Sequence, residues 1–266
     1  MRQHHPESEI AAGNSWYVGD QFRAQLGSRG RCRVIEDRWK VFAAMLHDWR
    51  RRRGHVAADS LAILDAGCGD GINLVGLRNL VAAAGLRARL VGVDYNPIRL
   101  ARAHDAHRSA WLQQASVYAL PFATDCFDVV LCNHVVEHLP DLSTALRELA
   151  RVLRPGGLFI VGTPNEGCLM GRARNRYVQP SIARDTDHVH FFTASTLRRT
   201  LGDAGLRIER LERETFFFPC SHANVCCNEF AIGHWLMARL RRMFPSQAGG
   251  LIVACDKAAG DMTSRG

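Results

Sequence analysis

The sequence predicts an α/β fold, with a doubly wound, mostly parallel sheet between two layers of helices. Short apolar runs that end in an acid or a glycine recur along the chain, and segments with helical spacing separate them. This alternation is typical of parallel sheets, because parallel neighbours need a crossover connection. The chain of 266 residues is long enough for one such domain with appended segments, and no internal repeat is evident.

The first predicted elements are a loose polar arm over residues 1–30 and an amphipathic helix that Gly54 ends. The helix is indicated by large apolar residues at helical spacing, namely Ile35, Trp39, Phe42, Leu46 and Trp49. We interpret residues 1–54 as a cap over a substrate site. The arginines at 50–53 lie where this helix ends, and the helix dipole favours cations there. We therefore interpret them as a solvated helix end, with an RNA contact as the alternative.

A glycine-rich turn follows the first predicted strand. It holds Gly67, Gly69 and Gly71, with Asp65 and Asp70 beside them. Glycines allow a sharp turn and the close approach of a ligand, because they have no Cβ atom. The next residues have helical spacing, so the segment predicts a ligand at a helix N-terminus, with an ordinary turn between strand and helix as the alternative.

The acids beside this turn distinguish it from common phosphate-binding loops. Ile72 stands where a dinucleotide-binding G-x-G-x-x-G motif counted from Gly67 has its third glycine, and no Gly-Lys-Ser or Gly-Lys-Thr follows as in a P-loop. Carboxylates disfavour a phosphate and favour a ligand with a positive ammonium or sulfonium group. S-adenosylmethionine carries both groups, so the turn predicts this cofactor.

A second apolar run, residues 90–93, ends at Asp94. A carboxylate at such a strand end can accept hydrogen bonds from ribose hydroxyls, and a helix-capping acid is the alternative. Asn96 and Pro97 then predict a helix start. The later predicted elements are a helix from Asp141 to Arg154, a strand at 158–161, a helix capped by Thr193 or Ser195, strands at 206–218 and 251–255, and an amphipathic segment at 230–240.

In their order and spacing, the motifs resemble those of the class I S-adenosylmethionine-dependent methyltransferases over roughly residues 60–255. The most similar branch is that of the small-molecule enzymes, including the quinone-biosynthesis type. The resemblance implies a Rossmann-like, seven-stranded sheet with one antiparallel strand near its edge. It is carried by residues 64–71 (LDAGCGDG), 93–94 (VD), 119–122 (ALPF), 127–141 (FDVVLCNHVVEHLPD) and 154–157 (RPGG).

Roles for the cofactor-binding residues follow from the same resemblance. Asp94 would bind the ribose hydroxyls, and Tyr95 would pack on the adenine. Asn133 and His134, after the fourth strand, would lie beside the sulfonium and its methyl group. The methionine part of S-adenosylmethionine would lie against the turn, namely Asp65, Gly67, Cys68, Gly69, Asp70 and Gly71.

The predicted adenine pocket departs from the family pattern at one position. The family usually has an aspartate a few residues before Leu-Pro-Phe, where it receives the adenine amino group. This chain has Ser116 there, followed by Val117. A hydroxyl accepts the same hydrogen bond without a charge, so the adenine contact is expected to be weaker.

A catalytic base is required only if the methyl acceptor holds a proton that it does not readily lose. The candidates are His138, His188 and His190, because imidazole titrates near neutral pH. Packing or capping is the alternative for His138. His188 and His190 would share one face of an extended segment, as a substrate-facing base or as a structural pair bonded to the backbone. They could bind a metal only with a third ligand, and none is evident, so no metal site is predicted.

Composition narrows the class of protein. The first residues lack the apolar core of a signal peptide, no apolar run reaches membrane-spanning length, and the nine cysteines show no C-x-x-C pattern, so we expect a cytoplasmic protein. The formal net charge is +8, and arginine fills 32 of the 34 basic positions. That skew favours a compositional origin of the charge over a nucleic-acid ligand.

The sequence as a whole predicts an enzyme that methylates a small molecule, by in-line transfer to oxygen. One alternative is an RNA or other nucleic-acid methyltransferase, although the fourth strand ends in Cys-Asn-His-Val and not in the Asn/Asp-Pro-Pro-Tyr/Phe of amino-group enzymes. The other is a non-catalytic binding protein with the same fold, which an intact cofactor turn argues against. The catalytic domain is predicted over residues 55–258, with substrate-wall insertions at about 166–192 and 219–247 and a disordered tail at 259–266.

Overall fold

One seven-stranded sheet forms the centre of the molecule, in the order β3-β2-β1-β4-β5-β7-β6. The computed structural model describes residues 18–53, 60–107, 109–178, 180, 187–218 and 220–257. Strands β1 to β5 pair in parallel, whereas β7 is antiparallel to both β5 and β6, which confirms the predicted sheet. The strands are β1 (Ser60–Ala66), β2 (Arg87–Asp94), β3 (Trp111–Gln114), β4 (Phe127–Asn133), β5 (Leu153–Pro164), β6 (Leu206–Phe216) and β7 (Ala248–Lys257).

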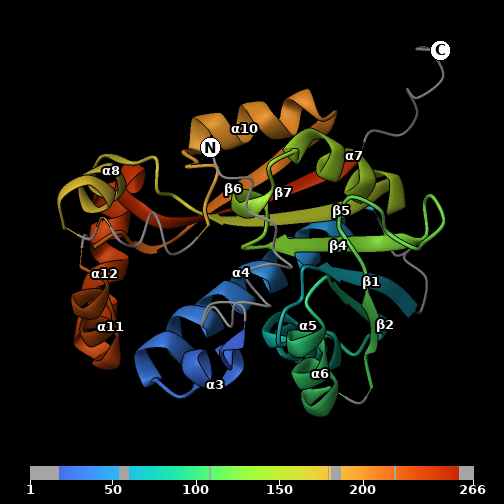
Figure 1. Ribbon diagram of the computed structural model, residues 1–266, viewed down its shortest axis with the longest axis horizontal. Helices are drawn as coiled ribbons and strands as arrows, with labels where there is room; N and C mark the ends of the chain where they lie inside the picture. The colour runs from blue at the N-terminus through green and yellow to red at the C-terminus, as the bar shows by residue number, and fades with distance from the viewer. Residues whose placement is uncertain are drawn as a thin grey trace.

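Helices cover both faces of the sheet (Figure 1). One layer consists of α4 (Arg29–Arg52), α5 (Ile72–Ala83) and α6 (Pro97–Ala106), and the other of α7 (Leu142–Val152) and α10 (Ala194–Asp203). Each layer packs on its own hydrophobic cluster. Ile63 and Leu64 are consecutive, fully buried residues of β1 that belong to different clusters, because successive side chains of a strand point to opposite faces.

The starts of the helices agree with the signals in the sequence. The side chain of Asn96 accepts hydrogen bonds from the first backbone N–H groups of α6, and Pro97 is the first residue of that helix. Asp141 caps α7 in the same way. Of the two candidates for the cap of α10, Thr193 fills the position and forms a capping box with Thr196.

Three features of the secondary structure differ from the prediction. Helix α7 ends at Val152 and not at Arg154, because Leu153 already pairs with β4 as the first residue of β5. The short strand β3 was not predicted from the sequence. Part of the expected loose arm is ordered, since α3 (Gln21–Leu26) lies within it and Ser28 caps α4.

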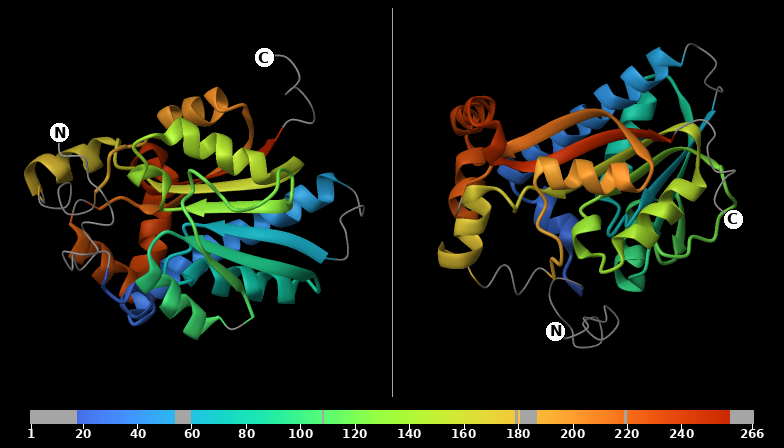
Figure 2. Two further views of the ribbon diagram at one scale, coloured as in Figure 1. Left: turned by 45° about the vertical axis from the view of Figure 1, so that its right-hand side comes forward. Right: turned by 90° about the horizontal axis from the view of Figure 1, so that it is seen from above.

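The two predicted insertions hold additional helices. After β5 come α8 (Leu169–Ala173) and η3 (Arg174–Val178), and between β6 and β7 come α11 (Ser221–Glu229), α12 (Ala231–Met243) and η4 (Pro245–Gln247). Figure 1 shows α8, α11 and α12 at one end of the molecule, and the turned views of Figure 2 show the same end. Among the described residues, no helix is long and apolar enough to cross a membrane. The predictions for Gly54 and for residues 1–17 and 259–266 lie outside the described residues.

Candidate functional site

A cavity of about 410 Å³ lies at the edge of the sheet where the parallel strands end. In open parallel sheets, ligands bind at this edge, beside the point where the strand order reverses. Here that point lies between β1 and β4. The lining comes from the glycine turn after β1, the segment after β4, and helices α3, α4 and α11.

The turn after β1 has a backbone that only glycine adopts readily. Gly67, Gly69 and Gly71 all have φ between +53° and +88°. A Cβ atom on Gly67 would lie 2.3 Å from the side chain of Val135, and one on Gly71 would lie 2.6 Å from His107. The glycine turn therefore fits closely against its neighbours, as the sequence predicts.

Asp65 is the clearest sign that this edge of the sheet binds a ligand. Its side chain is fully buried at the end of β1, and neither carboxylate oxygen has a hydrogen-bond partner among the described residues. Burial raises the pKa of Asp65 to about 8, and the nearby charge of Asp94 adds to the rise. A buried carboxylate without a partner is costly, so the site favours a ligand that brings a positively charged donor.

Asp94 holds the turn in place from the end of β2. Its two carboxylate oxygens accept hydrogen bonds from the backbone N–H groups of Gly69, at 2.8 Å, and Asn96, at 2.9 Å. Burial raises the pKa of Asp94 although these two bonds oppose the rise. Each oxygen retains a lone pair, so Asp94 organises the turn and can still accept from a ribose.

Helix α5 begins at the same turn and offers the complementary charge. Gly71 precedes the helix and supplies no side-chain cap. The first N–H groups of a helix have no partner inside the helix and attract anions. Asn73 and Asn133 each have a buried side-chain oxygen without a partner among the described residues. The site thus suits an amino-acid group, whose ammonium and carboxylate meet Asp65 and α5.

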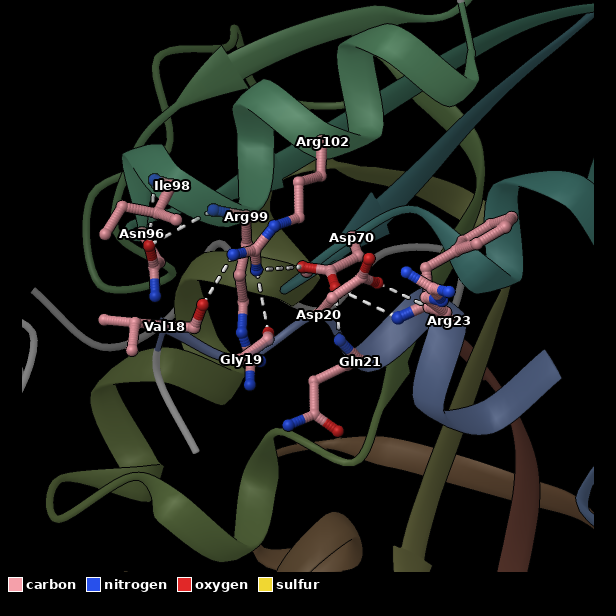
Figure 3. A network of polar contacts seen from close by, with 12 residues as sticks. Val18, Gly19, Asp20, Gln21, Arg23, Asp70, Asn96, Ile98, Arg99 and Arg102 are labelled. Atoms are coloured by element: carbon pink, nitrogen blue, oxygen red, sulfur yellow. Dashed lines mark hydrogen bonds and ion pairs between the residues drawn. The ribbon is translucent and has the colours of Figure 1, made fainter. Parts of the chain in front are cut away.

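Asp70 lines the cavity and also contacts the N-terminal part of the chain. One of its oxygens accepts hydrogen bonds from the backbone N–H groups of Gln21, at 2.7 Å, and Phe22, at 3.0 Å, at the start of α3 (Figure 3). Arg102 lies 3.9 Å from its other oxygen and donates to two backbone carbonyls just before α3. Asp70 therefore holds the start of α3 beside the cavity, and the role of residues 1–54 as a substrate cap stays a prediction.

His188 lies in the cavity lining, beside a partner that the sequence analysis did not single out. Its Nδ1 is 2.7 Å from a carboxylate oxygen of Glu166, which also pairs with Arg174. Burial acts to raise the pKa of Glu166, but His188 and Arg174 outweigh it and the pKa is lowered. The available signal was an acid just beyond the end of the fifth predicted strand, where this class of sheet places its ligands.

His138 lies against His188, with ring centroids 4.8 Å apart and an edge-to-face arrangement. Burial lowers the pKa of His138 to about 4, so the ring is neutral near pH 7 and is a weak base. The neighbouring Glu137 is buried and bonds to His134 and Thr163. Burial acts to raise the pKa of Glu137, but the hydrogen bond and charge of His134 prevail and lower it.

The same cluster contains the potential metal ligands of the site. Ligand atoms of Glu137, His138 and His188 all lie within 4.8 Å of one another, so the fold brings His188 together with Glu137 and with His138, another of the predicted candidates. Glu137 and His188 already have hydrogen-bond partners in this arrangement. The further ligand that the sequence did not reveal for His188 is thus present in the fold, whereas His190 is not part of this cluster.

The predicted cofactor residues differ in their relation to the cavity. Cys68, Asn133 and His134 belong to its lining. Tyr95 and Ser116 are exposed outside it, and Val117 is part of the core. Their proposed contacts with adenine stay predictions.

His190 is also outside the lining. Its Nε2 lies 2.9 Å from the backbone carbonyl of Leu139. A contact with the backbone is one of the two alternatives that the sequence left open for this pair. His190 therefore differs from His188, which contacts a carboxylate in the cavity lining.

Comparisons with known proteins agree with this site. A sequence profile described as "Methyltransferase domain" matches residues 64–161. A ubiquinone biosynthesis O-methyltransferase of Aeromonas salmonicida is 33% identical over 178 residues, which make up 64% of this chain and 70% of that protein. A probable S-adenosylmethionine-dependent methyltransferase of Mycolicibacterium smegmatis is 31% identical over 151 residues, which cover 55% of this chain and about half (52%) of that protein.

A solved structure shows the same fold. An S-adenosylmethionine-dependent methyltransferase of Methanosarcina mazei superposes with a TM-score of 0.53 at 20% identity, covering 81% of this chain and 97% of that one. The matched profile begins at Leu64 and so includes the glycine turn and Asp94. The unpartnered carboxylate of Asp65 and the open start of α5 fit the amino-acid group of S-adenosylmethionine. The chain belongs to the class I S-adenosylmethionine-dependent methyltransferases.

Proposed function

We propose that the protein transfers the methyl group of S-adenosylmethionine to a hydroxyl oxygen of a small molecule. The observation that carries the proposal is His188, which lines the cavity beside the glycine turn with its Nδ1 held by Glu166. Pockets of a few hundred Å³ are typical of small-molecule sites. The relative from Aeromonas salmonicida is itself named an O-methyltransferase, which supports oxygen as the acceptor.

The cofactor would be held by Asp65 and the start of α5, which have open hydrogen-bonding groups among the described residues, and by Asp94. Asp65 would bind its ammonium group, the first N–H groups of α5 its carboxylate, and Asp94 its ribose hydroxyls. Bound S-adenosylmethionine supplies an electrophilic methyl group on a sulfonium, so the protein has mainly to orient the acceptor and exclude water. Helices α3, α4 and α11 complete the lining and would serve that purpose.

His188 would act as the base for the acceptor hydroxyl. Its Nδ1–H donates to Glu166, which leaves Nε2 free to take a proton. Glu166 stays ionised beside Arg174 and would stabilise the imidazolium that forms. His138 is unsuited to this task because its pKa is about 4, and a base works best when its pKa lies near the working pH.

The distribution of charge supports a small molecule over a nucleic acid. Many arginines face carboxylates of the same chain, which neutralise them locally. Examples are the pairs Arg38–Glu214 and Arg210–Asp48, each at 2.6 Å, and Arg154–Asp128 at 2.5 Å. A nucleic-acid interface needs a face of unpaired cations that can contact phosphates. The net charge of +8 by itself therefore does not indicate such a face.

The function can be tested with a cell extract and S-adenosylmethionine that carries a labelled methyl group. We expect the label in a small molecule, attached to oxygen, when the products are separated and identified by mass spectrometry. The matched control is the Asp94→Ala variant, which should label the same product far more slowly when the cofactor is limiting. Label that appears in the RNA, DNA or protein fraction, or on nitrogen or carbon of a small molecule, would contradict the proposal.

The buried Asp65 makes a prediction about pH. Its pKa of about 8 means that it holds a proton at pH 7 in the free protein, whereas an ion pair with the ammonium requires the carboxylate. Binding therefore releases a proton, and affinity should rise as pH increases from about 5 toward 7.5, by up to about tenfold per pH unit. Calorimetry with S-adenosylhomocysteine, in buffers of different ionisation enthalpy, measures both the slope and the released proton. Asp65→Asn should bind more weakly and lose the slope; a wild-type affinity independent of pH would refute this role.

A further inference from the structure

Helix α12 turns its large apolar side chains toward solvent. Ile232, Trp235, Leu236 and Met243 have exposed fractions of 78%, 56%, 47% and 69%. Trp235, Leu236 and Met243 follow Ile232 by three, four and eleven residues, which places all four along one side of the helix. A surface helix normally buries such a stripe, so the orientation of α12 needs an explanation.

The inward side of α12 is held by polar contacts. His234 lies 2.7 Å from the side-chain oxygen of Asn228 and 2.9 Å from Asp37 of α4. Arg241 donates to the backbone carbonyl of Arg213 on β6. These contacts orient the helix with its apolar side outward. An exposed apolar stripe held in this way is typical of an interaction surface.

The apolar stripe is accompanied by positive charge. Arg239 and Arg242 are exposed on the same helix, and Arg239 lies over the ring of Trp235, 4.9 Å from its centroid. Residues 231–247 contain no aspartate or glutamate. A second copy of this chain that paired through α12 would therefore bring arginines against arginines. The complementary partner is an apolar surface that carries negative charge.

We propose that α12 binds to the surface of a membrane that contains anionic lipids. A basic helix with tryptophan and aliphatic residues on one side inserts that side at the boundary between headgroups and acyl chains. The 13 residues of α12 are too few to cross a bilayer, so the helix lies along the interface. Phe230 and Phe244 are also exposed, at the two ends of the helix.

The position of α12 connects this surface with the cavity. Helix α11 packs against both α12 and α4, and it contributes Asn224 and Asn228 to the cavity lining. In Figure 1, α11 and α12 lie together at one end of the molecule, away from the helix layer of α7 and α10. A membrane bound at α12 would therefore lie next to a helix of the cavity wall. The proposal itself does not depend on which molecule is methylated.

The test is co-flotation of the purified protein with vesicles. We expect binding to vesicles of phosphatidylcholine with phosphatidylglycerol, weak binding to phosphatidylcholine alone, and release at high salt. Ile232→Ser combined with Trp235→Ser should lower the binding constant about tenfold or more. Arg239→Glu combined with Arg242→Glu should lower it by at least about fivefold per arginine, since each cation near an anionic surface contributes to that extent.

Matched controls lie elsewhere on the surface. Trp111→Ser on β3 removes another exposed tryptophan, and Arg198→Glu with Arg199→Glu on α10 reverses two other exposed arginines. These variants should bind vesicles like the wild type, and melting temperatures verify that all variants fold. The proposal is overturned if the wild type does not float with anionic vesicles, or if the α12 variants float as well as the controls. It is also overturned if light scattering shows a dimer that the α12 variants dissociate and that does not bind lipid.

Discussion

Replacing His188 with alanine should lower turnover by about 10²–10⁴-fold, the usual contribution of a positioned base. His188 lines the cavity, and its bond to Glu166 leaves one ring nitrogen to accept the proton. Cofactor affinity should stay near that of the wild type, because the residues proposed to bind the cofactor lie elsewhere, on the turn after β1 and on α5. The measurement needs an acceptor whose hydroxyl is not acidic, since an acidic one would ionise without help.

His190 provides the matched control for this experiment. It is two residues away but bonds to the backbone carbonyl of Leu139. His190→Ala should lower the melting temperature and leave turnover per folded molecule nearly unchanged. Glu166→Gln should reduce turnover less than His188→Ala, because an amide still positions His188 but does not stabilise the imidazolium. If His188→Ala retains full turnover, His188 is not the base.

Replacing Asp94 with alanine should weaken cofactor binding by about a hundredfold or more. Each hydrogen bond to a charged group contributes roughly 1.5–3 kcal/mol, and two such bonds would be lost from the ribose. The structure adds a second effect. Asp94 also accepts from the backbone N–H groups of Gly69 and Asn96, so the glycine turn should loosen and the melting temperature should fall. Calorimetry with S-adenosylhomocysteine measures the affinity, and thermal unfolding measures the stability.

Asp128 separates these two effects. It too accepts a hydrogen bond from a backbone N–H group, that of Ala62 at 2.8 Å, but it lies at the opposite end of the sheet from the cavity. Asp128→Ala should lower the melting temperature and leave cofactor affinity unchanged. Equal dissociation constants for the Asp94→Ala variant and the wild type would place the ribose contact on another residue.

Features that depend on neighbours in the chain were predicted well. The glycine turn, the cap at Asn96 and the end of β2 at Asp94 are each determined by a few adjacent residues. The order of these units along the chain predicted the doubly wound sheet, and the resemblance predicted its antiparallel strand. The short β3 was missed because four residues carry too weak a pattern. The early end of α7 was missed because pairing of Leu153 with β4 decided it.

The sequence by itself determined the fold class, the family and the cofactor, because each motif responsible is a short run of adjacent residues with local backbone preferences, and the motifs follow one another in a characteristic order. Only the tertiary structure decided how the candidate base is held. Glu166 and His188 are 22 residues apart, and His190 and Leu139 are 51 apart, so no local pattern reveals either contact. The outward stripe of α12 is likewise a result of packing. Its periodicity predicts an amphipathic helix, but the bonds of His234 and Arg241 to other elements determine which side faces solvent.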